Sequence, residues 1–293
     1  MLLVGCGQET EQTGTMPENV EEESDIVEVE IENLDEIEQI QSQPSQPVQK
    51  SKKRIIVAVI GAPATEILES AAISMQYSDY EIEAVICDDY NKPNDMVLSG
   101  DADACLYENR LYLESYNKRN TTDLTIVERS YYEPLAVFAG TVKDLNDIPS
   151  GVKVAVQNGD VNRARALYLM KQKGLLDIKE GSYYQASMED VIDNPYDISL
   201  EEVDIAGGWP DASAYGLIIC DKDRAMLAGI DPDTSLGEEN RNSELLDMFS
   251  ICLVTAKGKE NGDKIKELSK ALNSDLVEEF ITEKYHGAVV DYR

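Results

Sequence analysis

Apolar residues along the chain form two patterns, which are short continuous runs and runs spaced like one face of a helix. Seven runs of aliphatic and β-branched residues end near Gly, Pro, Asn or Asp and predict strands. The run at 123–140 is long enough for two strand pieces. The seven lie at 53–60, 81–87, 101–107, 123–140, 152–156, 215–220 and 249–256.

Helical spacing of apolar residues follows several of these runs. The predicted helices lie at 64–75, 111–119, 161–174, 262–273 and 274–285, and Ser274 is the expected N-cap of the last. Strands that alternate with helices indicate an α/β fold with mostly parallel sheets. In such sheets ligands bind beyond the carboxyl ends of the strands.

Small, polar or aromatic residues follow five of the predicted strands. Each group alone is ordinary turn chemistry, because Gly, Pro, Asn and Asp end strands in most proteins. The agreement of five ends favours a binding cleft. The five ends are 61–65, 88–90, 107–109, 158–160 and 221–223.

The first 53 residues have a different pattern. Residues 7–53 are rich in Glu, Gln and Ser and contain no aromatic residue, so they cannot bury enough apolar surface to offset the entropy of ordering. Thirteen acidic residues and one lysine lie in residues 1–50. The pattern predicts a disordered acidic linker at 7–53. No apolar run in the sequence approaches the roughly 18–20 residues that span a bilayer.

The whole chain has 293 residues and a formal net charge of −31, which excludes nucleic acid and anionic lipid surfaces as natural partners. Its 42% of apolar residues suffice for one large domain or two lobes. The sequence has no GxSxG, Walker, HExxH or paired Cys/His motif. It therefore predicts no catalytic residue, no cofactor and no metal site.

The five cysteines do not form a disulfide scaffold. Four of them lie in or at the end of apolar runs and are expected to be buried free thiols, although a disulfide among them stays open. These four are Cys87, Cys105, Cys220 and Cys252. Cys6 is different, because it ends the stretch LVGC at 3–6.

LVGC resembles a bacterial lipobox, in which the cysteine is lipidated and becomes the new N-terminus. An acidic linker behind it would then act as an extended tether. Only five residues precede Cys6, so residues 1–6 are interpreted as the end of a longer signal peptide. An ordinary N-terminus, or an internal start that gives a cytosolic form, remains the alternative.

From Arg54 onward the chain resembles the NlpA lipoproteins, the substrate-binding proteins of methionine-type ABC importers. The motifs that carry the resemblance are VAVIGAPATEILE (57–69), DDYNKPN (88–94), YLESYNK (112–118), TDL (122–124), EPLAVF (133–138), NRARALYLM (162–170), DNPYDISLEEVD (193–204) and FITEKYHGAVV (280–290). The resemblance implies a type II periplasmic-binding-protein-like fold with two α/β lobes. The first lobe would comprise 54–135 plus 250–293, and the second 136–249, with crossings near 130–140 and 247–254.

The resemblance also implies a function. The chain would bind methionine, a related amino acid or a short peptide between its lobes and deliver it to an ABC permease and ATPase. It would be a monomer held by a lipid anchor on the extracytoplasmic face of the cell membrane. A ligand-binding sensor without transport is an alternative, and an enzyme on the same fold is a weaker one.

The site residues implied by the resemblance include rings that contact the ligand. Tyr90 and Tyr112 match tyrosines of the family, and Tyr107 keeps an aromatic ring. Arg165 matches the arginine that takes the ligand carboxylate, and Asn162 lies one helical turn before it on the same face. A helix N-terminus also favours a carboxylate, and a guanidinium grips one with two prongs. The neighbouring Arg163 is expected to be solvated.

Several positions depart from the family pattern. Asn109 replaces a histidine, and Glu108 replaces a neutral amide. Asp221 and Asp223 stand where the family has asparagines, and in an extended chain they point to one side. Asp221 suits a ligand ammonium, whereas Glu108 and Asp223 are surplus for methionine. Trp209 is expected to add to the apolar wall of the site.

Overall fold

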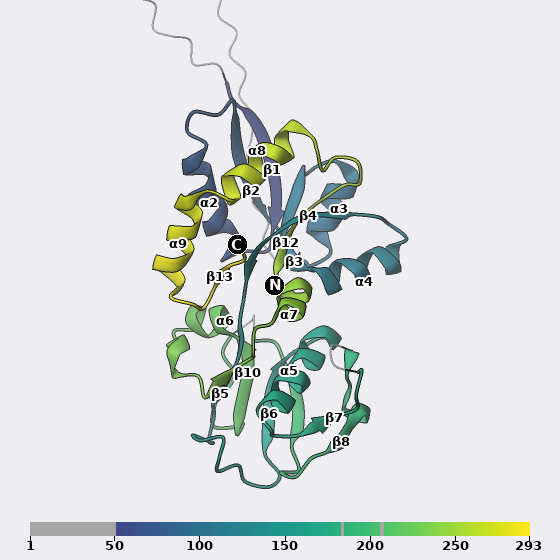
Figure 1. The fold of residues 1–293 in the computed structure, drawn as a ribbon, viewed down its shortest axis with the longest axis vertical. Helices are drawn as coiled ribbons and strands as arrows, with labels where there is room; N and C mark the ends of the chain where they lie inside the picture. Colours follow the sequence, from purple (N-terminus) through teal and green to yellow (C-terminus); the bar gives the residue numbers. More distant parts are fainter. Residues whose placement is uncertain (1–50, 183–184, 206–207) are drawn as a thin grey trace, which may run out of the picture. The chain divides into compact units, whose positions relative to one another are not determined.

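Two β-sheets organise residues Ser51–Arg293, which form one unit of the chain in the computed structural model (Figure 1). The structure describes residues 51–182, 185–205 and 208–293. The predicted lipobox with Cys6 and all but the last three residues of the predicted linker lie outside the described residues.

The first sheet has six strands in the order β13-β4-β12-β3-β1-β2. Its strands come from both ends of this unit, before residue 133 and after residue 250. They are β1 (Lys53–Val59), β2 (Tyr80–Ile86), β3 (Ala104–Asn109), β4 (Thr125–Tyr132), β12 (Ile251–Thr255) and β13 (Val290–Asp291).

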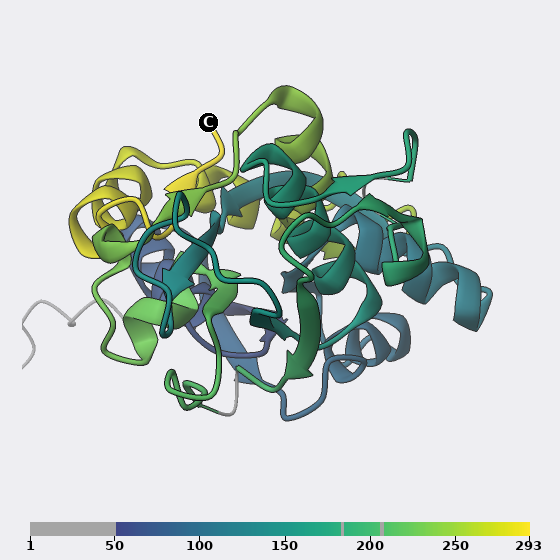
Figure 2. The same cartoon turned by 90° about the horizontal axis from the view of Figure 1, so that it is seen from below.

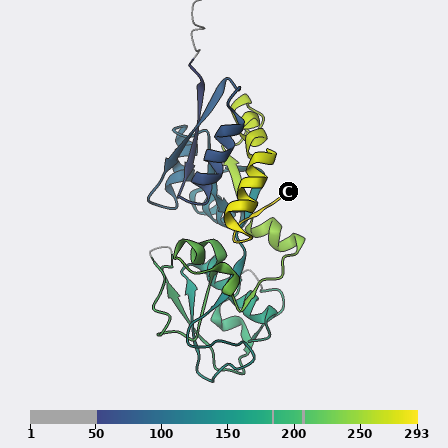
Figure 3. The same cartoon turned by 90° about the vertical axis from the view of Figure 1, so that its left-hand side faces the viewer.

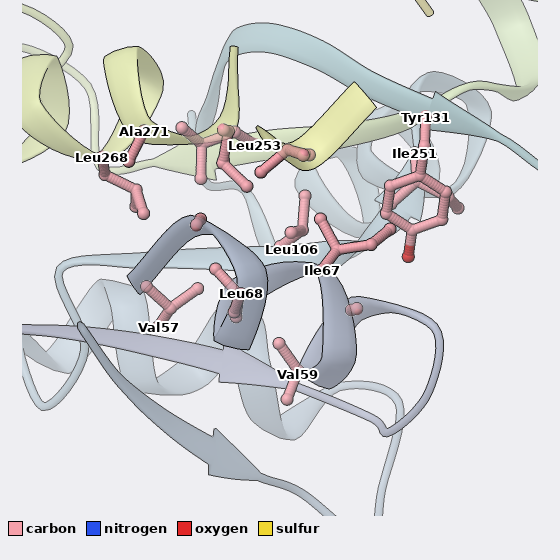
Figure 4. Packing of buried hydrophobic residues seen from close by; sticks show 14 of the residues in the cluster. Val57, Val59, Ile67, Leu68, Leu106, Tyr131, Ile251, Leu253, Leu268 and Ala271 are labelled. Carbon is pink, nitrogen blue, oxygen red and sulfur yellow. The ribbon is translucent and has the colours of Figure 1, made fainter. Parts of the chain in front are cut away.

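Helices cover both faces of this sheet, which explains why its inner strands β1 and β12 contain continuous apolar runs. Alternate residues of β1 point to opposite faces. Val57 packs with Ile67 and Leu268 (Figure 4). Ile281 of a third helix belongs to the same cluster, whereas Ala58 packs with Val97 and Leu113 on the other face. The first face is covered by α2 (Ala64–Ser74), α8 (Asp263–Leu272) and α9 (Asp275–Tyr285), and the second by α3 (Lys92–Ser99) and α4 (Arg110–Asn120).

Two further views show this layering. Figure 3 shows α2 together with the yellow C-terminal helices along one side of the first sheet. In Figure 2 the yellow helices and the blue helices of residues 92–120 lie at opposite sides. The helices thereby leave the end of the sheet around Asn109 uncovered for a site.

The second sheet has five strands in the order β11-β5-β10-β6-β9. Helix α5 (Asp160–Gln172) covers one face, where Leu167 and Met170 pack with Val137, Val156 and Ile219. The other face packs with a smaller cluster that contains Phe138 and Cys220. The strands are β5 (Leu135–Ala139), β6 (Lys153–Gln157), β9 (Ser199–Val203), β10 (Leu217–Asp221) and β11 (Gly237–Glu238).

The expectation of mostly parallel sheets is wrong. Strands β1, β2 and β3 pair in parallel, and so do β10, β6 and β9. The strands next to the sheet crossings pair antiparallel, namely β12 with β3 and β4, β13 with β4, and β5 with β10 and β11. The run at 123–140 divides into β4, which enters the first sheet, and β5, which enters the second.

Short elements escaped the sequence analysis. Helices α3, α6 (Lys222–Leu227) and α7 (Ser243–Phe249) and the hairpin of β7 (Asp177–Ile178) with β8 (Val191–Asp193) were not predicted. Ser274 is the N-cap residue of α9, as predicted, but its hydroxyl donates to the Ala271 carbonyl at 2.8 Å and does not cap α9. The helices at 64–75, 111–119, 161–174, 262–273 and 274–285 are all present within two residues of the expected ends.

Candidate ligand-binding site

A cavity of about 460 Å³ opens where residues of both sheets and their helices meet. Four of the five polar strand ends line it, at Tyr90, 107–109, 158–160 and Asp221, whereas residues 61–65 do not. All seven ligand-binding residues named from the sequence are among the lining residues, namely Tyr90, Tyr107, Asn109, Tyr112, Asn162, Arg165 and Asp221.

Three tyrosines form one wall of the cavity. The rings of Tyr90 and Tyr107 lie 6.5 Å apart between centroids, and those of Tyr107 and Tyr112 lie 5.9 Å apart, edge to face. Their positions come from the β2–α3 connection, β3 and α4. Asn109 fixes this corner, because its Oδ1 accepts the Tyr112 backbone N–H at 3.0 Å and caps α4. Trp209 is not part of the wall; it packs edge to face on Phe138 at 5.6 Å.

The N-terminus of α5, the helix that covers the second sheet, also lines the cavity through residues 157–162. Its N-cap residue is Gly159, so no N-cap side chain bonds the first N–H groups of the helix. Asn162 donates from Nδ2 to the Asn158 carbonyl at 2.9 Å. The free N–H groups of a first helical turn favour an anion.

Arg165 lies one turn further along α5 and is already paired with the protein. Its side chain is 6% exposed and contacts both carboxylate oxygens of Glu239. Its Nη1 donates to Asp221 at 2.8 Å, and its Nη2 donates to the Glu133 carbonyl at 2.7 Å. Within the described residues, these contacts leave one N–H of Nη1 for a ligand, so the expected two-pronged grip is not available in this arrangement.

Arg163 was expected to be solvated, and the structure corrects this. Its guanidinium pairs with Glu202 at 2.6 Å and with Asp160 at 2.7 Å, and its side chain is 24% exposed. The partner Glu202 extends from the neighbouring strand β9, which sequence reasoning had not found.

Three carboxyl groups gather beside Arg165. One carboxylate oxygen from each of Glu133, Asp221 and Asp223 lies within 4.8 Å of the other two. The sequence placed the two aspartates on one side of a strand. In the structure Asp221 ends β10 and Asp223 lies in α6, so a turn into a helix, and not strand pleating, brings them together.

Burial changes the protonation of this cluster. Burial raises the pKa of Asp223 to about 7, with Arg224 opposing the shift and Asp221 adding to it. Burial also raises the pKa of Glu133 well above its usual value, and Asp223 and Asp221 add to the shift. Arg224 lines the cavity, and its Nε lies 3.5 Å from Asp223 Oδ2.

Glu108 is a buried carboxyl group behind the tyrosine wall. It accepts a hydrogen bond from Asn94 Nδ2 at 3.2 Å and lies near the Cys105 thiol, and burial raises its pKa to about 8. Sequence analysis treated it as a surplus charge, whereas the structure makes it largely neutral at pH 7. The thiols of Cys87, Cys105, Cys220 and Cys252 are buried and free, as predicted.

The sequence missed Glu133, Arg224 and Glu239 as members of the site. Glu133 was quoted within EPLAVF, and its place between β4 and β5 was a usable signal, because a residue between two sheets faces the space between them. Glu239 lies 74 positions from Arg165 in a segment without periodicity, so nothing in the sequence connects the two.

A second hollow of about 550 Å³ lies on the first sheet's side of this unit. It is lined by residues 74–80 except Gln76 and by part of α8, including Glu267 and Lys270. It has one acidic and one basic residue from α8 and no cluster of buried charges. The cavity with Arg165 is therefore the better candidate site.

Comparison with known proteins agrees with this geometry. The family described as NlpA lipoprotein matches residues 55–292. The chain belongs to the NlpA lipoprotein family. The match covers nearly the whole described part and includes every residue named in the cavity.

The relatives include a protein named for methionine binding and proteins of solved structure. The methionine-binding lipoprotein MetQ of Bacillus subtilis is 25% identical over 83% of this chain and 89% of its own length. A crystal structure of a protein from Ruminococcus gnavus is 33% identical, has a TM-score of 0.76, and covers 82% of this chain and 100% of its own. A nutrient-binding protein of Burkholderia cenocepacia, solved bound to methionine, is 25% identical with a TM-score of 0.73 and covers 81% of this chain and 99% of its own.

Proposed function

We propose that this chain is the extracytoplasmic substrate-binding lipoprotein of an ABC importer, and that it binds methionine, a related amino acid or a short peptide. The observation that carries the proposal is the cavity, in which a wall of three tyrosines faces charged groups on the second sheet. An apolar wall with a few convergent polar groups is typical of small-molecule sites, and about 460 Å³ is within their usual size.

The cavity lies between two lobes in this proposal. The lobes are 54–135 plus 250–293 and 136–249, which correspond to the two sheets. The ligand's side chain packs on Tyr90, Tyr107 and Tyr112. Its polar end faces the N-terminus of α5, the remaining N–H of Arg165, and the carboxylates near Asp221.

Membrane attachment in this proposal is by a lipid on Cys6, and the acidic linker at 7–53 tethers the folded unit on the extracytoplasmic face. The protein acts as a monomer and hands its ligand to a permease and an ATPase. No helix among the described residues has the length and apolar character to cross a membrane. The names of the relatives as lipoproteins support the anchor.

Ligand binding is expected to raise the melting temperature of ligand-free protein. A ligand that binds only the folded state stabilises it by about 2.7 kcal/mol at a hundredfold excess over its Kd. A thermal-shift screen of amino acids, amino-acid derivatives and dipeptides should therefore produce a shift of several degrees for a few compounds with methionine-like side chains. The absence of a shift with every compound, in protein shown to be ligand-free, would contradict the proposal.

Replacing Tyr90 with alanine is expected to weaken binding of the best compound from this screen by roughly tenfold or more, because the ligand loses an aromatic contact. The ring is 46% exposed in the ligand-free structure, so the free energy of unfolding should change by less than about 1 kcal/mol. Calorimetric titration measures the first effect and thermal unfolding the second.

A matched control is Tyr77→Ala. Tyr77 is 93% exposed, follows α2 and does not line the cavity. The Tyr77→Ala variant should leave the ligand affinity unchanged. Equal losses of affinity in both variants would show that the tyrosine wall does not contact the ligand.

A further inference from the structure

The guanidinium of Arg165 already has two carboxylate partners within the protein. Its guanidinium holds Glu239, whose side chain is 1% exposed, and also holds Asp221. A free amino acid would bring a third carboxylate to this guanidinium. Like charges at close range in a partly buried site repel strongly, so the site disfavours a free carboxylate next to Arg165.

Asp223 gives a second and independent indication. Its side chain is 1% exposed, and neither of its carboxylate oxygens has a hydrogen-bond partner of good geometry, although the backbone N–H groups of Asp223 and Arg224 lie close enough to lower its pKa. The nearest cation is Arg224, at 3.5 Å from Oδ2. A buried carboxyl group without hydrogen bonds is costly, which marks a place where a partner is missing.

The three carboxylate oxygens fit an ammonium group. For three atoms that all lie within 4.8 Å of one another, some point is within about 2.8 Å of all three, a distance typical of charge-assisted hydrogen bonds. An ammonium has three N–H donors, one for each oxygen. Glu133 and Asp221 line the cavity, so an ammonium on a ligand in the cavity reaches this point from the open side.

The local sum of charges favours a ligand with net positive charge. Glu133, Asp221, Asp223 and Glu239 contribute four carboxyl groups, and only Arg165 and Arg224 oppose them. Burial and the neighbouring carboxylates raise the pKa values of Glu133 and Asp223, which is the direction expected where negative charge is in excess. A zwitterionic ligand leaves the excess of negative charge unchanged, whereas a cationic ligand reduces it.

We propose that the cleft selects amines of net positive charge, with the ammonium held by Glu133, Asp221 and Asp223 and with no free carboxylate beside it. The chemical class is an amino-acid derivative whose carboxyl group is masked or absent. This inference rests on the proposed function and narrows it, since a methionine-like side chain still packs on the tyrosine wall. A divalent cation is the competing occupant, and the nearby Arg224 opposes it by its charge.

The test compares two probes that differ only at the carboxyl carbon. L-methionine is a zwitterion, whereas L-methioninol has the same side chain and amine and a hydroxymethyl group in place of the carboxylate. Calorimetric titration of the ligand-free full-length chain at pH 7.5 should give a Kd for methioninol at least tenfold lower than that for methionine. Tighter or equal binding of methionine would overturn the inference and leave the proposed function standing. Binding of neither probe would also overturn the inference, and the thermal-shift screen would then decide the proposed function separately.

Variants locate the effect in the carboxylate cluster. Asp223→Asn should reduce the preference for methioninol to threefold or less, and Glu133→Gln provides the same test if Asp223→Asn does not fold. Asp123→Asn is the control, because this carboxylate is 69% exposed and does not line the cavity, so the preference should not change. An unchanged preference in both cluster variants would overturn the inference.

Calcium chloride at 1 mM gives the last arm of the test. We expect no change in the melting temperature. A rise that Asp223→Asn abolishes would assign the three carboxylates to a metal ion and overturn the inference.

Discussion

Replacing Arg165 with alanine should destabilise the protein by about 3–5 kcal/mol, because the change leaves buried carboxylates without their cation. Glu239 would lose both of its contacts to the guanidinium, and Asp221 would lose its hydrogen bond at 2.8 Å. The guanidinium also stacks on Phe249, 4.6 Å from the ring centroid, so packing is lost as well. For a folded unit of this size the melting temperature should fall by roughly 6–20 °C.

Arg163→Ala is the matched control on the same helix. Its two ion pairs involve partly or fully exposed carboxylates, and such pairs contribute about 0–1 kcal/mol each. Thermal and urea unfolding of both variants, without added ligand, makes the comparison. If Arg165→Ala unfolds at the same temperature as Arg163→Ala, the buried network does not support the fold as described.

Replacing Glu108 with glutamine should stabilise the protein at high pH and leave it unchanged at low pH. Burial raises the pKa of Glu108 to about 8 in the folded state, above the ordinary glutamate value of 4.5. Between these two values the folded state binds more protons than the unfolded state, so the wild type loses stability as the pH rises. Glutamine has nearly the same shape and does not ionise, so the variant avoids this loss.

The expected difference is on the order of 2–4 kcal/mol at pH 9 and close to zero at pH 4.5. Denaturant unfolding of wild type and variant across this range measures it. Glu114→Gln is the control, since Glu114 lies on α4 with a side chain that is 63% exposed. A difference between wild type and Glu108→Gln that does not vary with pH would show that Glu108 is ionised throughout, against the burial argument.

The long elements were predictable because their patterns come from burial alone. β1 has apolar residues on both faces since helices cover both sides of its sheet, and a continuous apolar run shows this directly. Whether neighbouring strands pair parallel or antiparallel was not predictable, because an apolar run carries no information about the direction of the strand beside it. The chain changes sheets at the Glu133–Pro134 break between β4 and β5, which falls within the crossing near 130–140 that the resemblance implied.

The short helices α6 and α7 were not predicted, because they contain too few residues to show a helical spacing of apolar positions. Helix α7 has seven residues, and Asn242 caps it by accepting the Leu245 N–H at 2.8 Å. The cap was visible in the sequence, but seven residues hold too few turns for a pattern. Helix α6 has six residues and follows β10 directly, so the chain from Asp221 to Asp223 was expected to be extended and not helical.

The candidate site also contains residues that the sequence predicted and residues that it did not. Similarity to a family led to Tyr90, Tyr112 and Arg165, and the structure places all three at one cavity. Their partners were hidden because contacts across the fold do not follow sequence distance. The Arg165–Glu239 pair spans 74 positions, and only the folded chain shows that this arginine is already neutralised.

A crystal structure of the chain with the tightest compound from the thermal-shift screen tests the central claim most directly. We expect electron density for the ligand between the rings of Tyr90 and Tyr107 and the carboxylates of Glu133 and Asp221, with its amine facing Asp223. Density in the hollow lined by residues 74–80, with the tyrosine-lined cavity empty, would contradict the account.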